Sequence, residues 1–76
     1  MNKQRRAKLS DANMLLSKAV TIVEFARDEE QDSFDNLPEN LQDGDRGEAM
    51  EEAIEELQTA IDSINDAMNH IDRAKS

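Results

Sequence analysis

Residues 50–74 read MEEAIEELQTAIDSINDAMNHIDRA, and their large apolar side chains are spaced alternately four and three apart. The large apolar residues of this seam are Met50, Ile54, Leu57, Ile61, Ile64, Met68 and Ile71. Beside the seam, alanine recurs every seven positions, at Ala53, Ala60, Ala67 and Ala74. Such spacing places a continuous apolar stripe on one side of an α-helix. Small side chains in register allow a neighbouring helix to approach closely. The stretch therefore predicts a long helix packed against another.

The first half of the chain carries a similar pattern, with extra apolar residues beside it. Its central stripe consists of Leu9, Ala12, Leu16, Ala19, Val23 and Ala26. Leu15, Ile22 and Phe25 flank one side of that stripe, and Val20 and Phe34 flank the other. One neighbouring helix cannot cover so broad an apolar surface. We expect self-association through Leu15, Val20, Ile22, Phe25 and Phe34, with close packing at Ala53, Ala60 and Ala67.

A single turn is predicted between these halves, because residues 37–47 (LPENLQDGDRG) hold the only proline and both glycines. Proline disfavours a helical conformation for the residue before it, so Pro38 should end the first helix. Asp45 and Glu48 have the spacing of a capping box for the second. The expected elements are a basic arm at 1–8, either flexible or already helical, helices at about 8–36 and 46–74, and a turn at 37–46. Ser10 is a candidate start for the first helix.

Two helices of similar length, joined by a short connection, are expected to fold back as an antiparallel hairpin. The predicted fold is thus all-α: one coiled-coil-like domain over residues 1–76. A chain of this length hides only about 60% of its unfolded surface, and a hairpin cannot enclose a core. The absence of cysteine excludes disulfide support. We therefore expect the hairpin to form a homo-oligomer, such as a helical bundle.

Charge is distributed unevenly along the chain. Eighteen acidic residues against nine basic ones give a net charge of −9, and thirteen of the acids lie between residues 28 and 56. Most of the lysines and arginines lie near the two termini. A hairpin would therefore have one acidic and one basic end. The acidic balance disfavours direct binding of nucleic acid or anionic membranes. No apolar run approaches the ~20 residues of a membrane span, so a cytoplasmic protein is expected.

Residues typical of catalysis are few. There is no cysteine and no glycine-rich phosphate loop, and the single histidine, His70, lies near the C-terminus. The glutamates lack the Glu-x-x-His spacing of di-iron bundles. We therefore expect neither enzymatic activity nor a cofactor or metal.

Two binding regions remain as candidates, one at each end of the predicted rod. A protein partner would meet the acidic end through Glu48, Glu51, Glu52, Glu55 and Glu56. A small anion such as a nucleotide would meet the basic end through Arg5, Arg6, Lys8 and Arg73, since guanidinium groups bind phosphate bidentately.

The segments FDNLPENLQ (34–42), GEAMEEAI (47–54) and IDSI (61–64) resemble a family of short acidic proteins encoded in bacteriophage and prophage genomes. The resemblance covers roughly residues 30–68 and implies a phage context. Small acidic helical phage proteins often bind and block host machinery. The resemblance thus implies a non-catalytic inhibitor that sequesters a host component, such as a defence protein, in the host cytoplasm. Three alternatives remain: an oligomeric sponge for an anionic nucleotide signal, a DNA mimic presenting the acids of residues 28–56, and a purely structural coiled coil.

Overall fold

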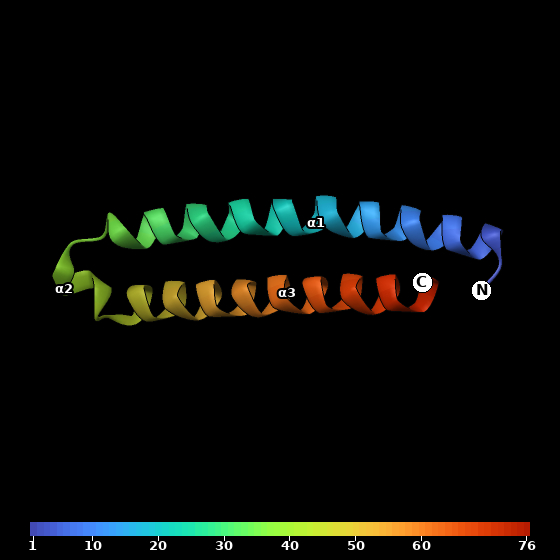
Figure 1. Cartoon of the computed structure of the whole chain (residues 1–76). Helices are drawn as coiled ribbons and strands as arrows, with labels where there is room; N and C mark the ends of the chain where they lie inside the picture. The colour runs from blue at the N-terminus through green and yellow to red at the C-terminus, as the bar shows by residue number, and fades with distance from the viewer.

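The computed structural model describes residues 1–76 as a rod of three helices measuring 58 × 15 × 12 Å. Helices α1 (Lys3–Asp35) and α3 (Asp45–Lys75) run antiparallel side by side, and the short α2 (Glu39–Gln42) lies in the connection between them (Figure 1). The predicted all-α hairpin is confirmed. None of the helices has the length and apolar character needed to cross a membrane.

Hydrogen bonds between side chains define the register of the two long helices. Lys75 Nζ donates to Ser10 Oγ at 2.9 Å, and Arg27 Nη1 donates to Gln58 Oε1 at 2.7 Å. Asn13 Nδ2 donates to Asp72 Oδ1 at 2.9 Å and to the Met68 carbonyl at 3.3 Å. In the three side-chain pairs the residue numbers sum to 85, so residue i of α1 lies opposite residue 85 − i of α3.

The hairpin has little interior. Val20 and Ile61 are its only buried apolar side chains, at 7% and 4% exposure. The sequence placed Val20 on a free flank, but α1 turns this residue toward α3, so it belongs to the core of the hairpin. Phe34 and the alanines Ala53, Ala60 and Ala67 are half-buried. The helices thus hold each other along a single seam.

The basic segment at residues 1–8 is not a separate arm, because α1 begins at Lys3 and runs through it. Asn2 caps this helix: its side-chain oxygen accepts a hydrogen bond from the Arg5 backbone N–H at 2.8 Å. Ser10 is an interior helical residue, so the predicted start there is wrong. Because Lys75 pairs with Ser10, the first turns of α1 extend beyond the end of α3 (Figure 1).

The connection is stabilised by one side chain, that of Gln42 at the end of α2. Its Nε2 donates to the carbonyls of Phe34 and Leu37, at 3.2 and 3.1 Å. Phe34 lies in the last turn of α1 and Leu37 just beyond it, where backbone carbonyls lack the acceptor role of the helix interior. The predicted capping box is wrong: Asp45 is already helical, and Gly44 is the N-cap without a side-chain hydrogen bond.

Gly47 is buried where the first turn of α3 meets α2. A Cβ atom at this position would lie 2.0 Å from the Gln42 carbonyl oxygen and 2.7 Å from its Cα. These are backbone atoms, which cannot turn aside as the tip of a side chain can. Glycine at position 47 therefore allows the contact between α2 and α3.

Gly47→Ala should lower the free energy of unfolding by about 1–3 kcal/mol, because the new methyl group overlaps backbone. Urea unfolding followed by circular dichroism, at one fixed protein concentration, measures the change. Gly44→Ser is the matched control, since a Cβ there meets its nearest atom at 3.6 Å. We expect it to change stability by no more than about 0.5 kcal/mol. Equal effects of the two substitutions would contradict this account of the turn.

Candidate functional site: two charged ends and an exposed apolar stripe

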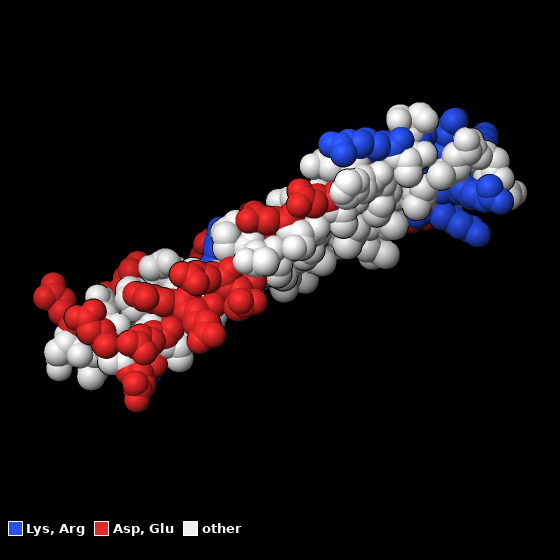
Figure 2. Space-filling view, turned by 90° about the horizontal axis from the view of Figure 1, so that it is seen from below, with Lys and Arg blue, Asp and Glu red and all other residues white.

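The two ends of the rod carry opposite charge. Acidic side chains gather around the turn and basic ones around the termini (Figure 2). In α3 this follows the helix dipole, with Asp45 and Glu48 in the first turn and Arg73 and Lys75 in the last. In α1 it does not, because there is no acid in the first turn and no base in the last. The charges of α1 are thus arranged against the preference of the helix itself.

The glutamates of the acidic end are free of ion pairs. The protein contains two salt bridges, Arg27 with Asp28 at 3.0 Å and Lys75 with Asp72 at 3.7 Å. Neither involves the five glutamates predicted to contact a partner, and all five are exposed: Glu48, Glu51, Glu52, Glu55 and Glu56. No lysine or arginine of the protein therefore forms an ion pair with this cluster.

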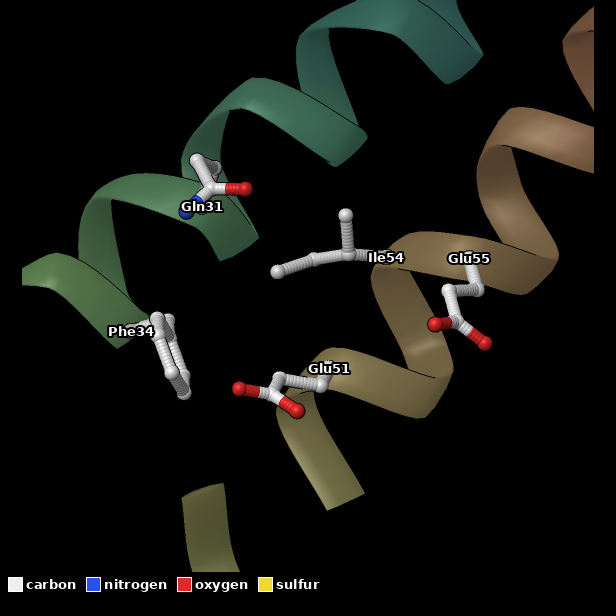
Figure 3. A pocket seen from close by; sticks show the side chains of 5 residues that line it. All are labelled: Gln31, Phe34, Glu51, Ile54 and Glu55. Carbon is white, nitrogen blue, oxygen red and sulfur yellow. The ribbon is translucent and has the colours of Figure 1, made fainter. Parts of the chain in front are cut away.

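A shallow hollow of about 230 Å³ opens beside these glutamates, between α1 and α3. It is lined by Gln31 and Phe34 on α1 and by Glu51, Ile54 and Glu55 on α3. In Figure 3, Glu51 and Ile54 extend toward α1, whereas the Glu55 carboxylate lies at the outer side. Phe34 and Ile54 supply an apolar surface, and Glu51 and Glu55 add carboxylates at its side. A lysine or arginine from a partner matches this arrangement, since its apolar stem can rest on Phe34 while its charged head reaches a carboxylate.

The hollow includes two of the five predicted glutamates and adds residues that the sequence analysis did not select. Glu48, Glu52 and Glu56 do not line it. The sequence did not identify Gln31 and Ile54 as site residues. The structure places them opposite each other, because their residue numbers sum to 85. Helical spacing places Gln31 with Phe34 on one helix, and Glu51 with Ile54 and Glu55 on the other. Only the register between the helices brings the two groups together.

At the basic end, a second hollow of about 240 Å³ is lined by Met1, Arg5, Lys8 and Leu9. The fold brings Arg5 and Lys8 together there, as the sequence suggested. Arg6 and Arg73 do not line this hollow. The register explains the absence of Arg73, which lies opposite Ala12, more than one helical turn beyond Lys8 along the rod.

The outer face of α1 exposes an apolar stripe, which consists of Met14, Leu15, Ile22 and Phe25. These side chains are 59%, 66%, 68% and 65% exposed. At 100° per residue, they point away from α3, on the face opposite Val20. Only Met1 and Leu41 are further large apolar side chains with comparable exposure, and α3 has none. The α1 stripe thus has no partner within the hairpin.

Metal-ligating side chains do not converge anywhere in the protein: no group of three or more His, Cys, Asp or Glu residues could hold an ion. His70 is exposed on α3.

No protein family, curated protein or solved structure matches the chain. The resemblance to short acidic phage proteins therefore stays a prediction. The residues that carry it have a structural role in this fold, because Phe34, Gln42 and Gly47 form the turn described above.

Adding EDTA should leave the melting temperature unchanged, because no cluster of ligands is available to bind a divalent ion tightly. Thermal unfolding followed by circular dichroism, with and without chelator, provides the test. A marked fall in melting temperature would show that the carboxylates of the acidic end hold a structural ion.

Proposed function

We propose that the protein is a self-associating, non-catalytic binding protein whose acidic end holds a basic surface of a partner protein. The observation that carries this proposal is the hollow beside the unpaired glutamates. Phe34 and Ile54 lie there next to the carboxylates of Glu51 and Glu55, without a positive side chain of the same chain. An apolar surface edged with free carboxylates favours lysine and arginine, which combine an apolar stem with a charged head.

Binding at this hollow would combine two contributions. Ion pairs from a lysine or arginine to the exposed Glu51 or Glu55 contribute about 0.2–1 kcal/mol each. The surrounding exposed acids would mainly accelerate encounter with a basic surface, and this effect weakens as salt screens the charges. Affinity should therefore fall with salt but should not disappear, because the apolar contact with Phe34 does not depend on ionic strength.

The biological role that we propose is sequestration. A rod that covers the basic surface of a host protein would prevent that surface from meeting its own anionic target. The resemblance to short acidic phage proteins supports this role and suggests a host defence protein as the partner. A DNA mimic would use the same acids, but it would act through its regular spacing of charge alone. The apolar floor of the hollow favours recognition of a protein side chain.

The triple variant Glu51→Lys, Glu52→Lys and Glu55→Lys should abolish binding of a basic partner. A fluorescently labelled amphipathic helical peptide, with leucine at positions i, i+3, i+4 and i+7 and lysine elsewhere, serves as the probe, and fluorescence anisotropy reports its binding. We expect at least a tenfold loss of affinity, about 1.4 kcal/mol, because attraction is replaced by repulsion. Circular dichroism should be unchanged, since the three side chains are exposed.

The matched control is the pair Arg5→Ala and Arg6→Ala, which changes charge at the other end and should leave peptide binding intact. Phe34→Ala distinguishes recognition of a basic side chain in the hollow from DNA mimicry, because a DNA mimic does not need the apolar surface of Phe34. We expect weaker peptide binding in this variant. Unchanged binding, together with competition by duplex DNA that vanishes at high salt, would favour the DNA mimic instead.

A second candidate function rests on the hollow at the basic end. Arg5 and Lys8 there flank Met1 and Leu9, a combination that suits a phosphate group attached to an apolar or aromatic moiety. In this reading the protein is a sponge that removes an anionic nucleotide signal. The chain has no tryptophan or tyrosine for stacking a base, so Leu9 and Met1 would have to cover it.

Isothermal titration calorimetry with mono- and dinucleotides tests this second function. If the sponge reading holds, the wild-type protein binds, and the variant Arg5→Ala with Lys8→Ala loses at least tenfold in affinity. Arg73→Ala should bind as the wild type does, because Arg73 does not line the hollow. Absence of any heat with the wild-type protein would eliminate the nucleotide reading and leave the acidic end as the binding site.

A further inference from the structure

We propose that the α1 stripe is the interface with a second copy of the protein, whose α1 packs against it in the antiparallel direction. The inference gives a surface and a geometry to the self-association in the proposed function, and it rests on that part alone. It does not depend on what the acidic end binds.

The accessible surface of the chain exceeds that of a compact protein of the same mass by about the area that a dimer interface would cover. The accessible area is 5661 Å², whereas a compact protein of 8.6 kDa would expose about 4,700 Å². The excess is about 1,000 Å². This is close to the ~800 Å² that each partner contributes to a stable interface. An elongated rod accounts for the excess by its shape, and lateral pairing along its length is the most direct way to bury it.

The position of the exposed apolar side chains selects the face. Four of the six large ones lie between Met14 and Phe25, near the middle of α1, and α3 has none. A two-fold axis beside the centre of this stripe would place Met14 of one copy level with Phe25 of the other. Residues whose numbers sum to about 39 then face each other across the pair. Self-pairing of a symmetric patch is the usual arrangement of a homodimer.

Charge complementarity selects the direction. In the antiparallel pair, the basic start of each α1 lies along the acidic end of its partner, with Lys3 and Lys8 near the levels of the partner's Asp35 and the partner's Asp32. Asp11 is an exception, since it is level with the partner's Asp28. Residues 3–11 still carry a net charge of +3 (four bases, one acid) against −5 for residues 28–36. A parallel pair would instead place like charges together.

The same arrangement explains two other features of the chain. The charges of α1 oppose its own helix dipole, yet they become favourable once a second α1 runs beside it in the opposite direction. Met1 and Leu41, the other two exposed apolar side chains, also come to the same level, because Met1 reaches the level of the partner's α2. Each of the six exposed apolar side chains then lies close to the level of another one along the rod.

The first test measures the molar mass in solution of the wild-type protein and of two variants, by light scattering coupled to size exclusion. The wild-type protein should have twice the 8.6 kDa mass of the chain. Leu15→Glu with Ile22→Glu should give a monomer. The hairpin should survive, because both side chains point away from α3, and circular dichroism checks this. Ser63→Glu with His70→Glu is the matched control, with equal charge and spacing on exposed α3 positions, and it should remain dimeric.

Spin labelling gives the direction. The chain has no cysteine, so Ser33→Cys carries a single label on the exposed surface of α1. Two labels should be about 40 Å apart in the antiparallel dimer, because position 33 of one copy is level with position 6 of the other, at 1.5 Å rise per residue. A parallel dimer would bring them to about 10 Å.

A charge exchange tests complementarity separately. Lys3→Glu with Lys8→Glu should weaken the dimer at least tenfold, and adding Asp32→Lys with Asp35→Lys should restore it. A label distance of about 10 Å, a failed restoration, or a dimer that persists in the Leu15→Glu and Ile22→Glu variant would overturn the antiparallel α1 interface while leaving self-association standing. A monomeric wild-type protein would overturn both.

Discussion

The contact between the backbone of Gly47 and the backbone of Gln42 determines how the two long helices meet. The Gln42 side chain also donates to the carbonyl of Phe34, in the last turn of α1, and to that of Leu37, just beyond it, so both ends of the connection are tied to one residue. Because these contacts define where α3 begins relative to α1, they set the register in which paired residue numbers sum to 85. A shift of one residue would separate Phe34 from Glu51 and Gln31 from Ile54. The hollow at the acidic end is therefore a product of the turn.

A second constraint follows from the hairpin itself: each helix has one neighbour. For α3 this is sufficient, since its large apolar side chains form a single seam. For α1 it is not, because Leu15, Ile22 and Phe25 lie on the face opposite Val20. The asymmetry between the helices assigns them different roles. Helix α3 combines the internal seam with the glutamates of the acidic end, whereas α1 has a face available for a second copy.

Charge connects the assembly to the proposed function. In the antiparallel dimer, the acids of α1 would be partly neutralised by the basic segment of the other copy. The glutamates at the start of α3 belong to a different helix, so they would stay free for a basic protein. Such a division would give the dimer an acidic surface at each end. It would also place Arg5 and Lys8 near acids of the other copy, which disfavours an anionic ligand there.

The sequence by itself determined the helical fold, the antiparallel direction and the unequal charge of the two ends, because heptad spacing and the single proline–glycine segment are local signals. It also located Leu15, Ile22 and Phe25 on a flank. Tertiary structure alone decided the rest. Val20 joined the core because of how α1 is rotated about its own axis relative to α3. Arg73 lay apart from Arg5 because of how far one helix is shifted along the other. The sequence offered several polar residues that could cap each long helix. Only the backbone conformation showed that α1 begins at Lys3 and that Gly44 is the N-cap of α3. The hollow between Phe34 and Glu51 required the register, which heptad patterns leave open since they repeat every seven residues.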